Sequence, residues 1–346
     1  MTVELLEDKK RWDQFVETSP QGLLFHKWDF LKTVERHSKY QFLPYCVYSG
    51  EELRCIFPFF IWRDRPLTYL CSPPPAHLGT QIPYLGPAFD PSVQALKATA
   101  KEKVLNQVTD EVCREIDRIA PNFVSIATVP NFIDVRSFIW KGYREHLSFT
   151  FTIDLEKSLD EIWASFTKHC RQAIKYVRAH SPEIQQTNDV SALLDIWRPR
   201  FPELGVQVPL LSDRYLKELV AAFPQDVTVY NLSIDGKLAT AAACCAMQKE
   251  RYGYWIGLVN ARKDLPVNEY LVWEVVRRAK SEGFKKLDLG EGDARVSPYK
   301  AKFDPVLEPF CFVERIDTLV KTVNFAWKRL SWAKKLVSGA IPRAHL

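Results

Sequence analysis

The two halves of the chain carry the same order of predicted elements, and this repetition constrains the fold more than any single motif. Each half reads as helices, a pair of hairpin strands, a helix and two further strands. In the second half, Asp235-Gly236 joins the runs VTVYNLSI and KLATAAACCAM, which is the strongest hairpin signal in the chain. In the first half, Ser49-Gly50-Glu51 turns one strand into the next. We therefore expect one α+β unit built twice, joined near residues 150–158.

The spacing of apolar residues predicts the individual elements. The expected helices cover residues 7–18, 27–38, 93–119, 159–179, 190–200, 213–223 and 268–281. The expected strands cover residues 42–48, 53–60, 123–129, 146–154, 227–234, 237–247, 252–259, 285–289 and 310–316. A chain of 346 residues exceeds what one core usually fills. We expect two domains, residues 1–153 and 154–317, each with a mixed sheet flanked by helices, and a basic helical tail over residues 318–346.

Composition and charge narrow the setting of the protein. A net charge of +5 permits an anionic ligand without implying a nucleic-acid-binding protein. The eight cysteines show no CxxC pair and no matched Cys/His spacing, so we expect neither a metal site nor a disulfide framework. The N-terminus is charged, and no apolar run approaches the length of a membrane span. We expect a cytoplasmic protein, whose tail docks as a helix on the protein or, alternatively, on a membrane surface or an acidic partner.

A charged loop follows the predicted strand that ends near residue 289. Six ionisable side chains crowd just past this strand: Asp288, Glu291, Asp293, Arg295, Lys300 and Lys302. Such a loop is costly to order, which makes it a candidate site. The alternative is a solvated surface loop.

Two helices offer further candidates for binding an anion. A basic ridge recurs at steps of three and four along the predicted helix 159–179, and it consists of Lys168, Arg171, Lys175 and Arg178. Such a ridge can hold phosphates through charge-assisted hydrogen bonds. Asn268 begins a later helix, whose free backbone amides can meet an anion or a carbonyl oxygen. The alternatives are a solvated helix face and an ordinary capped helix.

Several segments stand in a recognisable order along the chain. They are WDQFVETSP, FHKWDFLKTVE, the Pro-rich SPPPAHLGTQIPYLGPAFD, FTIDLEKSLDEIWASFTKHCRQAIKYVRAH, the Asp-Gly hairpin, NEYLVWEVVRRAKSEGFKKLDLGEGD and YKAKF. In this order they resemble the FemAB-like branch of the GNAT superfamily, which includes peptidoglycan-bridge aminoacyltransferases and the CelD-type acetyltransferases. The resemblance covers nearly the whole chain. It implies two tandem GNAT-like domains and the transfer of an acyl or aminoacyl group to an amine.

The resemblance also implies roles for single residues. Tyr299-Lys300 in YKAKF matches an FK dipeptide of the family that contacts the substrate or the reacting carbonyl, so Lys300 is the first catalytic candidate. A fixed lysine can stabilise a developing oxyanion, and an aspartate can accept the proton of the amine. Asp293 and Asp288 are candidates for those supporting roles, although Asp288 alternates with leucines and has a structural alternative. The substrate-binding candidates are Tyr299, Asn268, Tyr254, Arg171, Lys175 and Lys32.

Two departures from the family pattern leave the acyl donor open. The segment KDLPVNEY stands where CoA-binding GNAT enzymes carry an R/Q-x-x-G-x-G/A phosphate loop. The helical hairpin that some bridge-forming members insert is absent from the sequence as well. We expect no tightly bound cofactor, with acyl-CoA as co-substrate and aminoacyl-tRNA as the alternative.

The acceptor is expected to be an amine on a small molecule, peptide or sugar, such as a cell-envelope precursor. The stiff Pro-rich loop over residues 72–91 could line the acceptor cleft and present Tyr84 or His77 there. A different class of function stays open, namely a binding protein that keeps the fold without catalysis.

Overall fold

The computed structural model describes residues 1–75, 79–203, 212–262 and 264–318. The expected docked tail and His77 lie outside these residues. All eight cysteines are free and buried. None of the described helices is long and apolar enough to cross a membrane.

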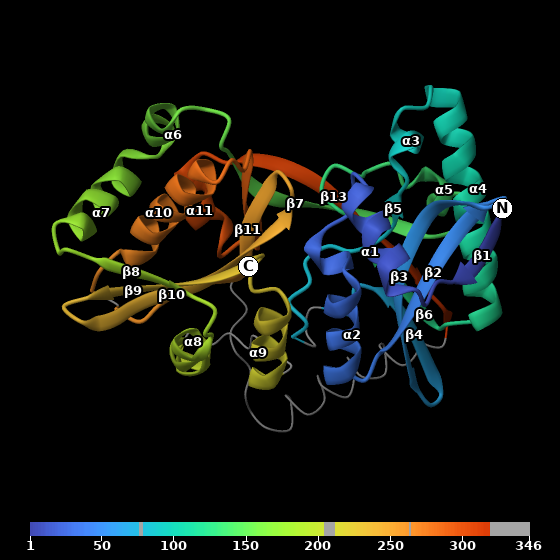
Figure 1. The fold of residues 1–346 in the computed structure, drawn as a ribbon, viewed down its shortest axis with the longest axis horizontal. Coiled ribbons are helices and arrows are strands. Elements are labelled where there is room, and N and C mark those ends of the chain that lie inside the picture. The colour runs from blue at the N-terminus through green and yellow to red at the C-terminus, as the bar shows by residue number, and fades with distance from the viewer. Residues whose placement is uncertain (76–78, 204–211, 263, 319–346) are drawn as a thin grey trace, which may run out of the picture.

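The described strands form one mixed sheet that runs through the whole molecule (Figure 1). The order of its strands is β1-β2-β3-β4-β6-β13-β7-β12-β11-β10-β9-β8, and β5 pairs with β3 beside this path. The strands are β1 (Thr2–Leu5), β2 (Gln41–Ser49), β3 (Glu52–Asp64), β4 (Leu67–Ser72), β5 (Ala88–Phe89), β6 (Phe123–Ala127), β7 (Arg144–Asp154), β8 (Glu183–Thr187), β9 (Val227–Ile234), β10 (Lys237–Gln248), β11 (Arg251–Asn260), β12 (Lys286–Glu291) and β13 (Val306–Ile316). The predicted α+β class is confirmed.

Helices cover both faces of this sheet. They are α1 (Lys9–Thr18), α2 (Trp28–His37), α3 (Pro91–Gln94), α4 (Ala98–Ile119), α5 (Arg136–Ile139), α6 (Leu159–Ser165), α7 (Lys168–Arg178), α8 (Ser191–Glu203), α9 (Asp213–Ala222), α10 (Val267–Ser281) and α11 (Ser297–Lys300). In the second half, α6, α7, α10 and α11 lie on one side of the strands, and α8 and α9 lie on the other (Figure 1).

The two halves exchange strands at the middle of the sheet. β13 belongs to the second half of the sequence, yet it pairs with β6 of the first half. β7, which we expected to close the first half, pairs with β13 and β12 instead. The division of the chain at residue 153 stays a prediction, and the sheet is continuous across it.

Two helices that we predicted as single elements are each divided into two helices in the structure. In both, an extended residue interrupts the helix. The expected helix 93–119 consists of α3 and α4, separated at Lys97, whose ψ is 152°. The expected helix 159–179 consists of α6 and α7, since Phe166 is extended and the Thr167 side chain accepts the backbone N–H of Cys170 as an N-cap.

Local signals predicted other boundaries correctly. Asp235 and Gly236 adopt φ values of 53° and 70°, and Ile234 pairs with Lys237 across the two-residue turn. The capping box of Ser158 and Glu161 is present. The sequence did not predict the short strands β1, β4, β5 and β8. β4 lies between Pro66 and Pro73, which hide a strand of six residues from a pattern search.

The largest buried cluster joins the two halves on one face of the sheet. Phe30 of α2 packs against Phe223, with ring centroids 6.0 Å apart, and against Trp255 of β11, at 6.1 Å. Glu218 of α9 forms ion pairs with Arg36 and His37 of α2 beside this cluster. The first and second halves therefore share a hydrophobic core.

Candidate active site

The site begins where two parallel strands of the second half stop pairing. β11 and β12 pair only from Arg251 to Gly253 and from Lys286 to Asp288, although both strands continue. Gly253 permits this close approach, because a Cβ at this position would lie 2.8 Å from the Cβ of Asp288. The chain past Asp288 carries the charged loop and then α11.

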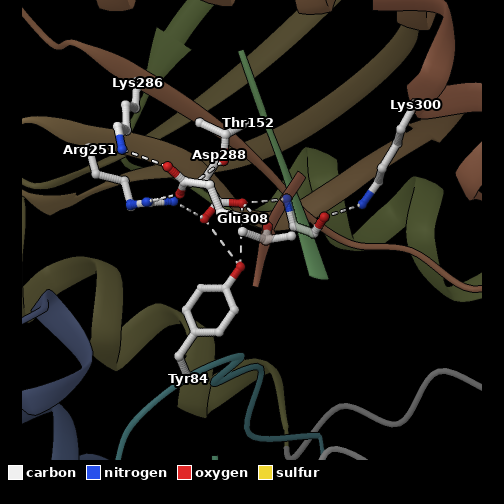
Figure 2. Close-up of polar contacts among 9 residues, drawn as sticks. Tyr84, Thr152, Arg251, Lys286, Asp288, Lys300 and Glu308 are labelled. Atoms are coloured by element: carbon white, nitrogen blue, oxygen red, sulfur yellow. Dashed lines mark hydrogen bonds and ion pairs between the residues drawn. The ribbon is translucent and has the colours of Figure 1, made fainter. Parts of the chain in front are cut away.

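Asp288 lies at the centre of a buried polar network that joins the two halves (Figure 2). Its carboxylate accepts hydrogen bonds from Arg251 Nη1 at 2.8 Å and from Tyr84 Oη at 3.1 Å. It also accepts the backbone N–H of Gly290 at 2.7 Å and the hydroxyl of Thr150. Asp288 is fully buried, so these four donors satisfy a charge that water does not reach.

Glu308 of β13 completes the network on the other side of Arg251. It accepts hydrogen bonds from Arg251, from Lys286 Nζ at 2.6 Å and from Thr152 Oγ1 at 3.4 Å. Burial opposes ionisation of Glu308, but Arg251 and Lys286 hold its pKa below the ordinary value. Arg251 therefore connects strands β11, β12 and β13 through two carboxylates.

Lys300 lies at the end of the same network. Its Nζ donates to the carbonyl oxygens of Gly290 at 2.9 Å and Glu291 at 2.7 Å, and lies 5.5 Å from the ring centroid of Phe151. Burial lowers the pKa of Lys300 to about 8, although the charges of Asp288, Glu291 and Asp293 oppose this shift. Since the N–H of Gly290 binds Asp288 and its carbonyl binds Lys300, the network fixes the lysine through the backbone (Figure 2).

Two tyrosine hydroxyls are buried without a hydrogen-bond partner among the described residues. They belong to Tyr254 of β11 and Tyr299 of α11. Burial raises the pKa of both well above the ordinary value, so both hydroxyls remain protonated. The ring of Tyr299 lies beneath Lys302, whose Nζ is 3.0 Å from the carboxylate of Glu269. A buried hydroxyl without a partner is the kind of group that a substrate atom or a water satisfies.

Two other predicted residues have identified structural contacts. Asp293 is exposed and accepts the backbone N–H groups of Arg295 at 2.9 Å and Val296 at 2.8 Å, which lowers its pKa and shapes the loop before α11. Asn268 Oδ1 accepts the hydroxyl of Thr240 at 2.7 Å, and α10 begins one residue earlier, at Val267.

The structure does not bring every predicted binding residue to this site. Arg171 Nη1 donates to the carbonyl oxygens of Ala164 and Phe166, so it closes the end of α6. Lys175 lies on the exposed face of α7. Lys32 pairs with Glu35 on α2, which is far from α11 in the molecule (Figure 1).

Sequence reasoning missed Arg251 and Glu308, and it considered Tyr84 only as the lining of an acceptor cleft. The partners are too distant in the chain to be paired from sequence: Arg251 and Glu308 are 57 residues apart, and Tyr84 and Asp288 are 204 apart. The only local sign of this network in the sequence was Arg251, a charged residue at the start of an apolar strand.

A pocket of about 460 Å³ opens between the two halves, at the start of β11 and β12. Arg251 and Lys286 contribute charged groups to it, and Gln21, Asn131 and Gln248 contribute amides. Its lining is therefore suited to a polar ligand with many hydrogen-bonding groups.

Part of the chain matches one domain family, and several solved structures share its fold. Residues 164–301 match the acetyltransferase (GNAT) domain family. No curated protein sequence matches the chain significantly. A crystal structure of FemX is similar over 90% of this chain and 97% of its own, with a TM-score of 0.67 and 10% sequence identity.

Two further solved structures share the fold over most of their length. The C-terminal domain (DUF2156) of a putative lysylphosphatidylglycerol synthetase from Agrobacterium fabrum covers 92% of this chain and 94% of its own, with a TM-score of 0.57 and 12% identity. A tandem GNAT protein from the clavulanic acid biosynthesis pathway is similar over 90% of this chain and 98% of its own, with a TM-score of 0.50 and 11% sequence identity. Residues 164–301 therefore match the acetyltransferase (GNAT) domain family, and the chain as a whole has the tandem GNAT fold of these solved structures.

Proposed function

We propose that this protein is an N-acyltransferase that moves an acyl group from a thioester to an amine, with Lys300 as the catalytic residue. The observation that carries this proposal is the position of Lys300 in a GNAT domain. Its ammonium is desolvated, fixed by two carbonyl oxygens and placed at the end of β12. A fixed cation in a partly buried site stabilises a developing oxyanion better than a solvated one.

The reaction requires a neutral amine close to a polarised carbonyl. The amine nitrogen attacks the carbonyl carbon, so a C–N bond forms and the carbonyl oxygen gains negative charge beside Lys300. The C–S bond then breaks, the thiolate leaves with the bonding electrons, and the nitrogen loses its extra proton to a base or to water. The hydroxyls of Tyr254 and Tyr299 are candidates for binding the substrate, because they remain protonated and have no partner.

Other site residues receive different roles in this proposal. Asp288 is enclosed by its four donors, which favours a positioning role over accepting the proton of the amine. Asp293 is exposed and shapes the loop, and it remains the candidate for that proton. The basic residues Arg171 and Lys175 remain candidates for holding a phosphate. The proposed acceptor is a polar amine such as a cell-envelope sugar or peptide precursor.

Acyl-CoA is the proposed co-substrate, and aminoacyl-tRNA is the second candidate donor. The second candidate is favoured by the first turn of α10. The segment KDLPVNEY stands at the start of this helix instead of a glycine-rich phosphate loop, so the backbone groups that would hold a CoA diphosphate in the usual way are missing from the sequence.

The proposal is tested by incubating the protein with acyl-CoA thioesters and a panel of primary amines while free thiol is measured. We expect thiol release that depends on the amine, and an acylated amine in the mass spectrum. Transfer from charged tRNA alone would replace the donor with the second candidate. Saturable ligand binding without transfer from any donor would contradict the proposed enzymatic function and would favour a binding protein.

A further inference from the structure

An apolar groove lies directly beside α11. It has a volume of about 580 Å³, and its ten lining residues carry no charge. One wall consists of Leu147, Phe149 and Phe151 of β7 with Leu307 of β13. The other wall comes from the charged loop and α11, which turn only uncharged residues such as Ala294 and Pro298 toward the groove. No charged residue of the loop is among the lining residues, although Glu291 accepts a hydrogen bond from the hydroxyl of Ser148 in the groove.

Except for Ser148, the strand residues of the groove are apolar, and three of them remain in contact with water. Across β7 and β13, Phe151 pairs with Leu307 and Leu147 pairs with Cys311, so these side chains share one face of the sheet. Leu147 and Leu307 are 53% and 51% exposed, and Phe149 is 39% exposed. A contiguous apolar surface of this kind in a concave site indicates a ligand.

One lining residue, Phe151, also contacts the proposed catalytic lysine. Phe151 lines the groove, and the Nζ of Lys300 lies 5.5 Å from its ring centroid. Gly292 allows the loop to approach this ring, since a Cβ there would lie 2.9 Å from Phe151 Cε2. An apolar ligand in the groove would therefore bring its polar end next to Lys300.

The size of the groove indicates a small ligand and not a macromolecule. A stable protein interface uses about 20–30 residues on each side, whereas the exposed apolar residues of this groove are Leu147, Phe149 and Leu307. A volume of about 580 Å³ lies in the range of small-molecule sites. A linear hydrocarbon chain fits a narrow groove with uncharged walls.

We propose that the groove binds the hydrocarbon chain of the acyl donor, so that the enzyme prefers medium- or long-chain acyl groups to acetyl. This inference rests on the proposed function, because it assigns the acyl class at the same site. Burying one methylene favours binding by about fourfold, so kcat/KM should rise by about that factor per added methylene until the groove is full.

The test compares acetyl-, butanoyl-, octanoyl- and palmitoyl-CoA as donors for one amine. Two variants change the groove: Leu307→Ser makes its wall polar, and Ala294→Phe narrows it. The matched control is Leu5→Ser, because Leu5 is 49% exposed on β1, at the far edge of the sheet. We expect octanoyl-CoA to exceed acetyl-CoA by more than tenfold in kcat/KM. The ratio should fall about tenfold in Leu307→Ser and in Ala294→Phe, and should not change in Leu5→Ser.

The outcomes separate this inference from the proposed function. Transfer at the same kcat/KM from acetyl- and octanoyl-CoA would contradict the proposal that the groove binds the acyl chain. The proposed acyltransferase activity would still stand. If no thioester is turned over, the proposed function is wrong. The role of the groove is then tested by comparing the affinities of octanoyl-CoA and acetyl-CoA in a calorimetric binding experiment. Tighter binding of octanoyl-CoA than of acetyl-CoA, weakened in Leu307→Ser, would support the groove as the binding site of the acyl chain. Equal binding of the two ligands would contradict it.

Discussion

At the scale of single residues, the site depends on two charges in different surroundings, the fully buried Asp288 and the partly buried Lys300. Asp288 receives four hydrogen-bond donors, including the guanidinium of Arg251. Lys300 receives two neutral carbonyl oxygens, and its burial lowers its pKa to about 8. The first charge is stabilised in the fold, whereas the second remains available to a substrate. This contrast separates a positioning residue from a catalytic one.

The pH dependence of transfer follows from the pKa of Lys300. If the ammonium stabilises the oxyanion, activity requires protonated Lys300, and it should fall about tenfold per pH unit as the pH rises above about 8. The measurement is a pH–rate profile with an acceptor amine that is already neutral at pH 6, so that its own titration does not contribute. Lys300→Arg, which stays charged, serves as the control and should show no such fall. A wild-type rate that keeps rising beyond pH 9 would contradict the role of the ammonium.

Removing Asp288 should destabilise the fold, because Arg251 would lose a buried partner. We expect Asp288→Ala to lower the free energy of unfolding by about 3–5 kcal/mol. Asp293→Ala, on the exposed part of the same loop, should cost only about 1 kcal/mol through the lost turn. Urea unfolding measures both values, and equal losses in the two variants would show that the network is not what stabilises this region.

At the scale of elements, local patterns predicted most helices and strands, but not how they pair. The hairpin at Asp235-Gly236 and the capping box at Ser158 depend on residues within a few positions of each other, so sequence revealed them. The insertion of β13 between β6 and β7 depends on contacts between distant segments, which no local pattern encodes. The same reason explains the site: Lys300 was found from a short motif, whereas Arg251 and Glu308 were not.

The parallel pairing of β11 with β12 predicts a strict need for glycine at one position. In Gly253→Ala, the new Cβ would lie 2.6 Å from Met247 Cε and 2.8 Å from Asp288 Cβ, so the strands would have to move apart. We expect a loss of about 1–3 kcal/mol in the free energy of unfolding. Gly257→Ala on the same strand is the matched control, because a Cβ there would meet no atom within 4 Å. A loss in Gly253→Ala no larger than in the control would contradict the close approach.

At the scale of the whole molecule, the strand exchange and the shared core tie the halves together. β13 of the second half lies between β6 and β7 of the first half, and the largest buried cluster draws residues from both halves. Tyr84 of the first half also contacts Asp288 in the second, so the site itself spans both halves. The tandem fold is therefore expected to behave as one cooperative unit.

Calorimetry tests this cooperativity. We expect one unfolding transition whose calorimetric enthalpy equals its van't Hoff enthalpy. Two separate transitions, each with the enthalpy of half a chain, would contradict the coupling through β13 and the shared core.

The most direct test of the account is acyl transfer by wild type and Lys300→Met, measured as amine-dependent thiol release. Met keeps the length and apolar contacts of the side chain while it removes the charge, and a matching melting temperature confirms that the variant folds. We expect kcat to fall by about 10²–10³, the loss typical for removing one group that stabilises an oxyanion. Transfer by Lys300→Met at the wild-type rate would contradict the central claim that Lys300 carries the chemistry.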